Sequence, residues 1–189
     1  MQERPALEGD LDAALLRARR GDEAGFLALW RALQPMLLRF LRVYVRDGYE
    51  DVAAETWLHV VRDLPSFDGD AGAFRRWLFT IARHRAIDAG RSRALRPLLL
   101  VGDARDLPAA TAMSAEEQAM TRLSTDDALE LLRRLPTAQA ELVALRVLAD
   151  LDVAAVAQIL GSTPGAVRVG VHRALKALSA HPDLTALEA

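Results

Sequence analysis

The sequence of 189 residues contains no cysteine and a single lysine, Lys176. Without cysteine the chain forms no disulfide, holds no thiolate-bound metal and has no thiol nucleophile. It also lacks an uninterrupted apolar run of about 18 residues, as a membrane-spanning helix needs. Its N-terminus, MQERPALEGDLDAALLRARR, lacks the basic start and apolar stretch of a secretory signal. We therefore expect a cytoplasmic protein with no membrane insertion and no redox chemistry.

Signatures of catalysis are also missing. There is no glycine-rich phosphate loop ending in Lys-Ser/Thr and no nucleophile elbow, and the histidines His59, His84, His172 and His181 show no metal-ligand pairing. The segment GSTPG at 161–165 is similar to a phosphate loop but has no lysine. We expect no catalytic residue, no metal site and no cofactor, and hence a protein that is not an enzyme.

The charge is nearly balanced, with a formal net charge of −2. This argues against tight DNA binding by the chain alone, because nonspecific affinity comes largely from basic residues that neutralise phosphates. The distribution is less even: seven arginines and the single acid Asp88 lie between Arg75 and Arg96. Arginine forks suit phosphates and base edges. GC-rich coding explains a preference for arginine over lysine equally well, so composition leaves DNA binding open.

Apolar residues recur at steps of three and four positions, and no stretch alternates strictly, which predicts an all-α protein. All tryptophans, tyrosines and phenylalanines precede residue 80, whereas residues 96–126 mix proline, glycine, small residues and acids. We predict two helical domains, 1–95 and 127–180, joined by a flexible linker at 96–126 and followed by a tail at 181–189. The expected helices cover about 11–20, 23–46, 49–64, 72–93, 127–134 and 138–148, followed by a pair at the C-terminal end.

That pair has the pattern of a helix-turn-helix, in the segment LDVAAVAQILGSTPGAVRVGVHRALKAL. Gly161 permits a tight turn, Thr163 can cap the next helix and Pro164 suits its first position. A helical wheel places Val167, Val171, Ala174 and Leu178 on one face of the final helix. It places Arg168, His172, Arg173 and Lys176 on the other. Such a face suits the major groove of DNA; an ordinary helical hairpin with a solvated basic face is the alternative.

The segment FRRWLFTIARHRAIDAGR at 74–91 also divides into two faces. The wheel places Phe74, Trp77, Leu78 and Ile81 on one side and Arg76, Thr80, Arg83, His84 and Arg91 on another. The arginine-bearing side suits duplex phosphates or the bases of an opened strand. Trp77, on the apolar side, fits a core residue better than a stacking platform.

The helix expected at 49–64 has an acidic outer face. Its inward positions are Ala53, Trp57, Val60, Val61 and Leu64, and its outward positions are Asp51, Glu55, Leu58 and Arg62. An acidic face on a DNA-binding module indicates a protein contact, although a solvated helix also has this pattern.

These features, in this order, resemble the extracytoplasmic-function class of bacterial RNA polymerase sigma factors. The segment FLALWRALQPMLLRFLRVYV and the segment YEDVAAETWLHVVRDLPSFDGDAGAFRRWLFTIARHRAID are similar to region 2 of that family. The segment LRRLPTAQAELVALRVLADLDVAAVAQILGSTPGAVRVGVHRALKAL is similar to its region 4. The resemblance covers about residues 23–95 and 127–179.

The resemblance implies that the chain binds core RNA polymerase and directs promoter-specific initiation of transcription. Its partners would be the coiled coil of the largest polymerase subunit, the polymerase flap, promoter DNA and an anti-sigma factor. The residues carried over for polymerase binding are Asp51, Glu55, Leu58 and Arg62. Those for melting and recognition of the minus 10 element are Phe67, Asp68, Arg76, Thr80, Arg83, His84 and Arg91. Those for reading the minus 35 element are Thr163, Arg168, His172, Arg173 and Lys176.

The sequence departs from the family in both regions. Ala54 stands where the acidic helix usually has glutamine, and Thr56 where an apolar residue is commoner. Gly170 and Val171 stand where the family usually has a basic residue and a leucine, so the promoter sequence is not predicted.

Two other functions share the helix-turn-helix, namely a conventional transcriptional regulator with an N-terminal sensing or dimerisation domain and an adaptor that binds only protein. The exposed acidic face together with the arginine-lined helix favours the sigma factor.

Overall fold

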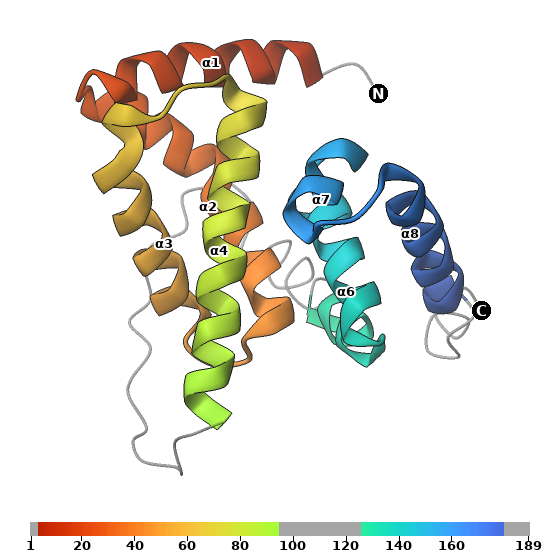
Figure 1. Cartoon of the computed structure of the whole chain (residues 1–189). Helices are drawn as coiled ribbons and strands as arrows, with labels where there is room; N and C mark the ends of the chain where they lie inside the picture. The colour runs from red at the N-terminus through yellow and green to blue at the C-terminus, as the bar shows by residue number, and fades with distance from the viewer. Residues whose placement is uncertain (1–3, 95–125, 180–189) are drawn as a thin grey trace, which may run out of the picture.

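The computed structural model describes residues 4–94 and 126–179, and all regular secondary structure in these ranges is helical, which confirms the all-α prediction. Figure 1 shows an N-terminal bundle beside a smaller C-terminal group of helices. The bundle consists of α1 (Arg4–Arg19), α2 (Glu23–Tyr44), α3 (Tyr49–Asp63), the 3-10 turn η1 (Leu64–Ser66) and α4 (Ala71–Ala94). The C-terminal domain, residues 126–179, consists of a helix at 126–134, α6 (Thr137–Val143), the π-helical turn η2 (Ala144–Leu148), α7 (Val153–Leu160) and α8 (Pro164–Ser179). The linker expected at 96–126, apart from its last residue, and the tail expected at 181–189 lie outside the described residues.

Aromatic side chains fill the core of the N-terminal bundle. Phe40 of α2 and Phe79 of α4 are fully buried and meet edge to face, with ring centroids 5.2 Å apart. Trp57 of α3 packs against Phe26 in the same way, at 5.6 Å, and its indole N–H donates to the side chain of Gln34 at 2.6 Å. The polar edge of the tryptophan is therefore satisfied inside the bundle, and α2, α3 and α4 share one apolar centre.

Two carboxylates fix the start of α4. Asp70 accepts a hydrogen bond from the backbone N–H of Ala73 at 2.7 Å, and Asp12 of α1 accepts one from the N–H of Ala71 at 2.6 Å. The first N–H groups of a helix have no partner within the helix, and negative charge near them is favourable. The contact from Asp12 also ties α1 to the beginning of α4.

The close packing of α1 on α2 depends on Gly25. A Cβ atom at this buried position would lie 2.7 Å from the Cβ of Arg17 and 2.8 Å from the carbonyl oxygen of Ala14. Backbone atoms cannot move out of the way as the tip of a side chain can, so any larger residue would push the two helices apart.

Two expectations about the bundle were wrong. The first helix begins at Arg4 rather than near residue 11. Pro5, in its first turn, is compatible with that early start, because the first helical position needs no backbone N–H. Val61, expected to point inward, is 51% exposed, whereas Ala53, Trp57, Val60 and Leu64 are buried as expected. Val52 and Thr56 complete the buried face instead, and the hydroxyl of Thr56 donates to the carbonyl of Val52 at 2.7 Å.

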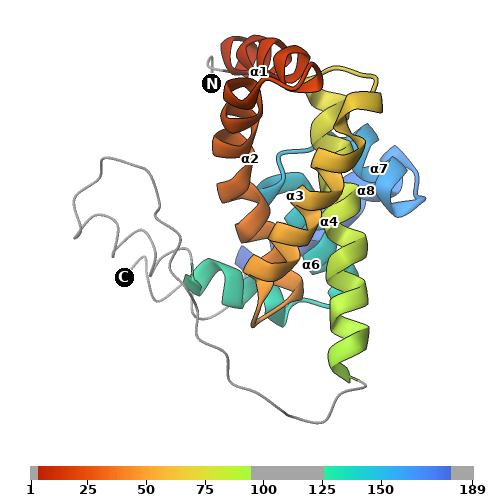
Figure 2. The same cartoon turned by 90° about the vertical axis from the view of Figure 1, so that its left-hand side faces the viewer.

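The two halves of the molecule share one apolar core. Leu145, Ala149 and Val156 of the C-terminal domain belong to the same buried cluster as Phe40 and Phe79. The C-terminal helices lie alongside α2 and α4, as the two views at right angles show, while α8 lies on the far side of α6 and α7 from the bundle (Figures 1 and 2). A smaller cluster of Leu129, Leu132, Val143 and Ala174 closes the C-terminal domain itself.

Asp152 caps α7, and its carboxylate accepts a hydrogen bond from the N–H of Ala155 at 2.7 Å. We expect Asp152→Ala to lower the free energy of unfolding by about 1 kcal/mol, because the substitution leaves a backbone donor of the first turn unpaired. Urea unfolding followed by circular dichroism measures the change. Asp152→Asn is the control, since asparagine caps equally well; a loss as large in the control would contradict the capping role.

Candidate nucleic-acid interface

The turn between α7 and α8 has the geometry that the sequence predicted. Gly161 adopts the left-handed conformation, with φ of 60°, and its N–H bonds back to Gln158 while that of Ser162 bonds to Ala157 at 2.9 Å. This pair of bonds is a Schellman motif, which ends α7 and turns the chain. The hydroxyl of Thr163 then accepts a hydrogen bond from the N–H of Ala166 at 3.2 Å, and Pro164 is the first residue of α8.

α8 divides into an inner and an outer face, as the helical wheel predicted. Val167 and Ala174 are buried against the rest of the C-terminal domain, and Val171 and Leu178 are half-buried. The polar positions Arg168, His172, Arg173 and Lys176 are all exposed. α8 lies on the far side of this domain from the bundle (Figure 1), and an exposed basic helix face suits the major groove of DNA.

The structure gives a physical reason for one departure of the sequence from the family that it resembles. Gly170 faces Leu142 of α6, and a Cβ atom at this position would lie 2.4 Å from the Cδ1 atom of Leu142. Any side chain here would have to displace that leucine. Gly170 therefore serves the close packing of α8 on α6, while the exposed basic residues of α8 stand at neighbouring positions.

The residues expected to contact the minus 10 element do not form one open surface. His84 is exposed, Arg76 and Thr80 are half-buried, and the hydroxyl of Thr80 donates to the carbonyl of Arg76 at 2.7 Å. Phe67 stacks on Trp77 with ring centroids 5.0 Å apart, while the Asp68 side chain is 97% exposed. Arg91 lies in α4, but its side chain is outside the described residues. The stacking fixes the conformation of the loop before α4.

Arg83, also expected to contact DNA, contacts the C-terminal domain. Its Nε donates to Glu141 of α6 at 2.6 Å, and the same carboxylate oxygen accepts the hydroxyl of Tyr44 at 3.1 Å. Both charged side chains are about four-fifths buried, with 21% of Arg83 and 16% of Glu141 exposed. The hydrogen bond to Glu141 raises the pKa of Arg83, and burial, together with the nearby Glu141 charge, raises the pKa of Tyr44 far above its usual range.

A second arginine of α4 makes a similar contact that sequence reasoning missed. Arg75 donates to the carboxylate of Asp150 at 3.1 Å and to its backbone carbonyl at 3.4 Å. Its side chain is only 12% exposed, and its Nε has no hydrogen-bond partner among the described residues. Asp150 precedes α7 and has a φ of 48°, which is uncommon for a residue other than glycine. No sequence pattern links Arg75 to Asp150, since the contact joins different domains.

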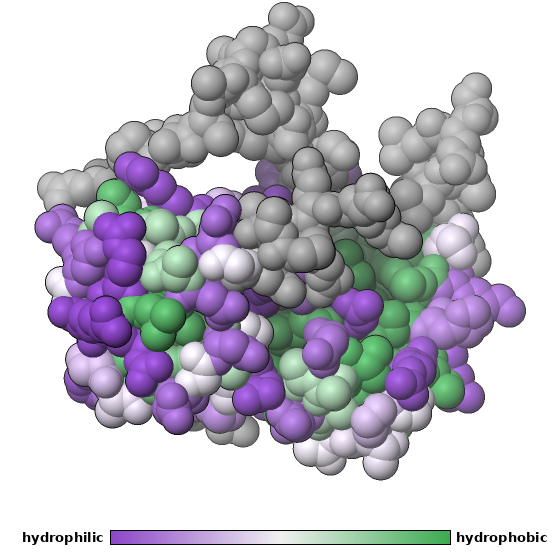
Figure 3. All heavy atoms as spheres, turned by 90° about the horizontal axis from the view of Figure 1, so that it is seen from above, coloured by the Kyte–Doolittle hydropathy of each residue, from purple (hydrophilic) through white to green (hydrophobic). Residues whose placement is uncertain are grey.

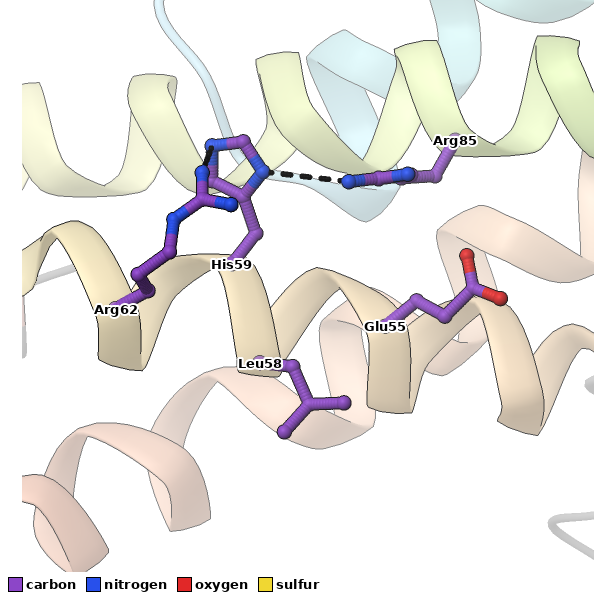
Figure 4. Close-up of a pocket in the computed structure, with 5 residues that line it drawn as sticks. All are labelled: Glu55, Leu58, His59, Arg62 and Arg85. Atoms are coloured by element: carbon purple, nitrogen blue, oxygen red, sulfur yellow. Dashed lines mark hydrogen bonds between the residues drawn. The ribbon is translucent and has the colours of Figure 1, made fainter.

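The outward residues of α3 form the second candidate surface. Asp51, Glu55, Leu58 and Arg62 are all exposed, and Leu58, at 71%, is the most exposed large apolar side chain among the described residues. Beside them lies a shallow hollow lined by Glu55, Leu58, His59, Arg62 and Arg85 (Figure 4). The ring of His59 lies between Arg62 and Arg85, at 3.4 Å and 3.5 Å, and its Nε2 is 3.1 Å from Asp63. The surface combines exposed acids, one apolar side chain and ordered basic groups.

Comparison with known proteins identifies the family of the chain. Residues 25–96 match the family described as Sigma-70 region 2, and residues 125–178 match Sigma-70, region 4. The chain is 34% identical over 186 residues to the ECF RNA polymerase sigma factor SigD of Mycobacterium tuberculosis, a match that covers 89% of this chain and 82% of SigD. It is 32% identical to the ECF RNA polymerase sigma factor ShbA of Streptomyces griseus, a match that covers 90% of this chain and 94% of ShbA. The chain belongs to the ECF RNA polymerase sigma factors.

A solved structure shares the fold of this sigma factor. The structure of CnrH in complex with the cytosolic domain of CnrY has a chain that superposes with a TM-score of 0.64 at 22% identity, covering 90% of the sigma factor and 96% of that chain. In the sigma factor, the exposed face of α3 lies in the part that matches region 2, and the helix-turn-helix lies in the part that matches region 4.

The surface of the sigma factor is unevenly apolar. Seen from above, apolar residues gather over the C-terminal helices, while polar residues prevail over the N-terminal bundle (Figure 3). Val147, Val169 and Leu175 are the large exposed apolar residues of the C-terminal domain.

Within residues 4–94 and 126–179, no helix is long and apolar enough to cross a membrane, and no group of acids and histidines is arranged to hold a metal ion.

Proposed function

We propose that this sigma factor binds core RNA polymerase through the outward face of α3 and reads the minus 35 element of promoters through α8. The loop before α4 and α4 itself would melt and hold the minus 10 element. The exposure of Asp51, Glu55, Leu58 and Arg62 together on one helix face is the observation that carries the proposal. Exposed charges with an apolar side chain at their centre are typical of a protein contact whose rim is polar.

The assignment of α8 to duplex DNA is supported by the shape of the helix-turn-helix. The capped turn presents the first turns of α8 outward, and Arg168, His172, Arg173 and Lys176 are exposed together. Arginine and lysine recognise guanine in the major groove, and the other contacts position the helix on phosphates. The domain boundaries proposed are 1–95 and 127–180, with the linker between them.

The proposal includes an anti-sigma partner, as expected from the family, and places the protein in the cytoplasm with the polymerase. It assigns no catalytic step to this chain. The net charge of −2 fits this function, because a factor that meets DNA as part of a larger complex needs little affinity of its own.

The decisive experiment is a pull-down with bacterial core polymerase followed by run-off transcription. We expect the wild type to bind and to give promoter-dependent transcripts. We expect the double variant Asp51→Arg, Glu55→Arg to bind about tenfold more weakly, because the reversed charges no longer complement a partner surface that accepts acidic side chains. The variant Asp10→Arg, Glu23→Arg carries the same charge change at exposed positions of α1 and α2 and is expected to behave as wild type. Absence of polymerase binding by the wild type would overturn the proposal.

A further inference from the structure

The outward face of α8 has an apolar side chain among its basic ones. Val169 is 49% exposed and lies two positions after the buried Val167, about 200° around the helix. Its side chain therefore points away from the domain core, on the same exposed side as Arg168, His172 and Arg173. Valine adds neither a charge nor a hydrogen-bonding group to this face, so any contact that it makes with a ligand is apolar.

Small residues before Val169 leave its approach to a ligand open. Gly165 and Ala166 stand one turn earlier in α8, and both are exposed. A Cβ atom at Gly165 would have a single side-chain oxygen near it, at 4.0 Å, so the surroundings of this turn are open. After the proline that begins α8, Arg168 and Val169 are the first exposed side chains larger than that of alanine. A surface that approaches the start of α8 therefore meets these two side chains first.

The bases of duplex DNA offer one distinctive apolar group in the major groove. When a helix-turn-helix binds DNA, the N-terminal residues of its second helix contact the base edges there. Most of what those edges present is a hydrogen-bond donor or acceptor, and thymine alone among the four bases carries a methyl group, at C5. Contact between an aliphatic side chain and this methyl removes apolar surface of both from water, whereas the same side chain over a polar edge leaves a donor or acceptor unpaired.

We propose that Val169 is a specificity-determining residue of α8 and contacts the 5-methyl group of a thymine in the minus 35 element. The inference rests on the proposed function, since it takes the minus 35 duplex as the ligand of α8. Arg168 and Arg173 supply polar contacts on the same face, and Val169 selects a thymine at one position of the element.

The charge of this face favours DNA over a protein as the ligand. The 16 residues of α8 include Arg168, Arg173 and Lys176 and contain no acid. Leu175 is the other large apolar residue of α8 that is exposed, at 45%, but it lies about 120° away from Val169 around the helix. The two side chains therefore form no joint apolar patch of the kind that lies at the centre of a protein contact. Val169 is a single apolar position on a basic face.

Deoxyuridine provides a direct test, because it differs from thymidine only in lacking the 5-methyl group. Holoenzyme assembled from core polymerase and the full-length chain first selects promoter duplexes from a library that is randomised over the minus 35 region. Each thymine of the selected element is then replaced in turn by deoxyuridine. Fluorescence anisotropy of the labelled duplex measures the affinity of the holoenzyme for each replacement.

We expect one thymine whose replacement weakens binding by the wild type about fourfold, which is the effect of burying one methyl group. In Val169→Ala, which removes the two γ-methyl groups from an exposed position, the same replacement should have little effect. Leu175→Ala is the matched control, because it also shortens an exposed apolar side chain of α8, and it should keep the dependence on the methyl group. Circular dichroism checks that both variants are folded.

Two results would overturn the inference: a selected minus 35 element in which no thymine depends on its methyl group, or a methyl dependence that persists in Val169→Ala. Failure of the proposed function is a separate outcome. It appears as absent polymerase binding by the wild type, or as a selection that enriches no sequence in the minus 35 region.

Discussion

Phe79→Ala is expected to lower the free energy of unfolding by about 3–5 kcal/mol, the cost of deleting a fully buried aromatic ring. Phe79 has no exposed surface and lies at the meeting point of α4 and α2, edge to face with Phe40 at 5.2 Å. Removing the ring leaves a cavity that the surrounding helices cannot fill without moving. Since a domain of this size is stable by only about 5–15 kcal/mol, much of the total would be lost.

Urea unfolding followed by circular dichroism tests this expectation, with a lower midpoint at an unchanged slope as the sign of lost stability. Leu58→Ala is the matched control, because it also shortens a large apolar side chain of the bundle, yet one that is 71% exposed. It is expected to change stability by less than about 0.5 kcal/mol. Equal losses in the two variants would mean that Phe79 does not lie in the core.

The second large effect is expected on promoter recognition. Arg168→Ala with Arg173→Ala should weaken binding of the holoenzyme to promoters with an intact minus 35 element about a hundredfold, because each specific contact from arginine to a base contributes about 1–3 kcal/mol. Both side chains are exposed on the outer face of α8, so their removal leaves the packed face of Val167 and Ala174 intact.

Run-off transcription on paired templates, one with a scrambled minus 35 element, measures the effect. The variant should lose activity on the intact template and show little further loss on the scrambled one. Arg20→Ala with Arg31→Ala, which removes an exposed arginine of the turn after α1 and another of α2, should leave both activities unchanged. A uniform loss on both templates would point to phosphate contacts without sequence reading.

Local sequence patterns predicted the helix-turn-helix closely. Gly161, Thr163 and Pro164 act within one turn of each other, so their spacing determines the end of α7 and the start of α8 without help from the rest of the fold. The two faces of α8 followed from helical periodicity for the same reason. Propensity and pattern therefore sufficed where the determining contacts are a few residues apart.

Contacts between distant residues could not be predicted in this way. The periodicity of α4 placed Arg83 on an open basic face, but Glu141, 58 positions further along the chain, covers it. Likewise Val61 follows the apolar spacing of α3, yet the helices of the described residues leave it 51% exposed. The pattern tells which side of a helix is apolar, while tertiary packing decides how much of that side is covered.

The apolar core shared by the two domains affects how readily the protein aggregates. If the domains separate, apolar side chains such as Leu145 and Leu151, now at most 3% exposed, come into contact with water. Newly hydrated apolar surface of this kind promotes association between molecules. An opened molecule is therefore prone to aggregate unless a partner covers that surface promptly. Variants that open the protein should accordingly bind more of a dye such as ANS and be less soluble at high concentration.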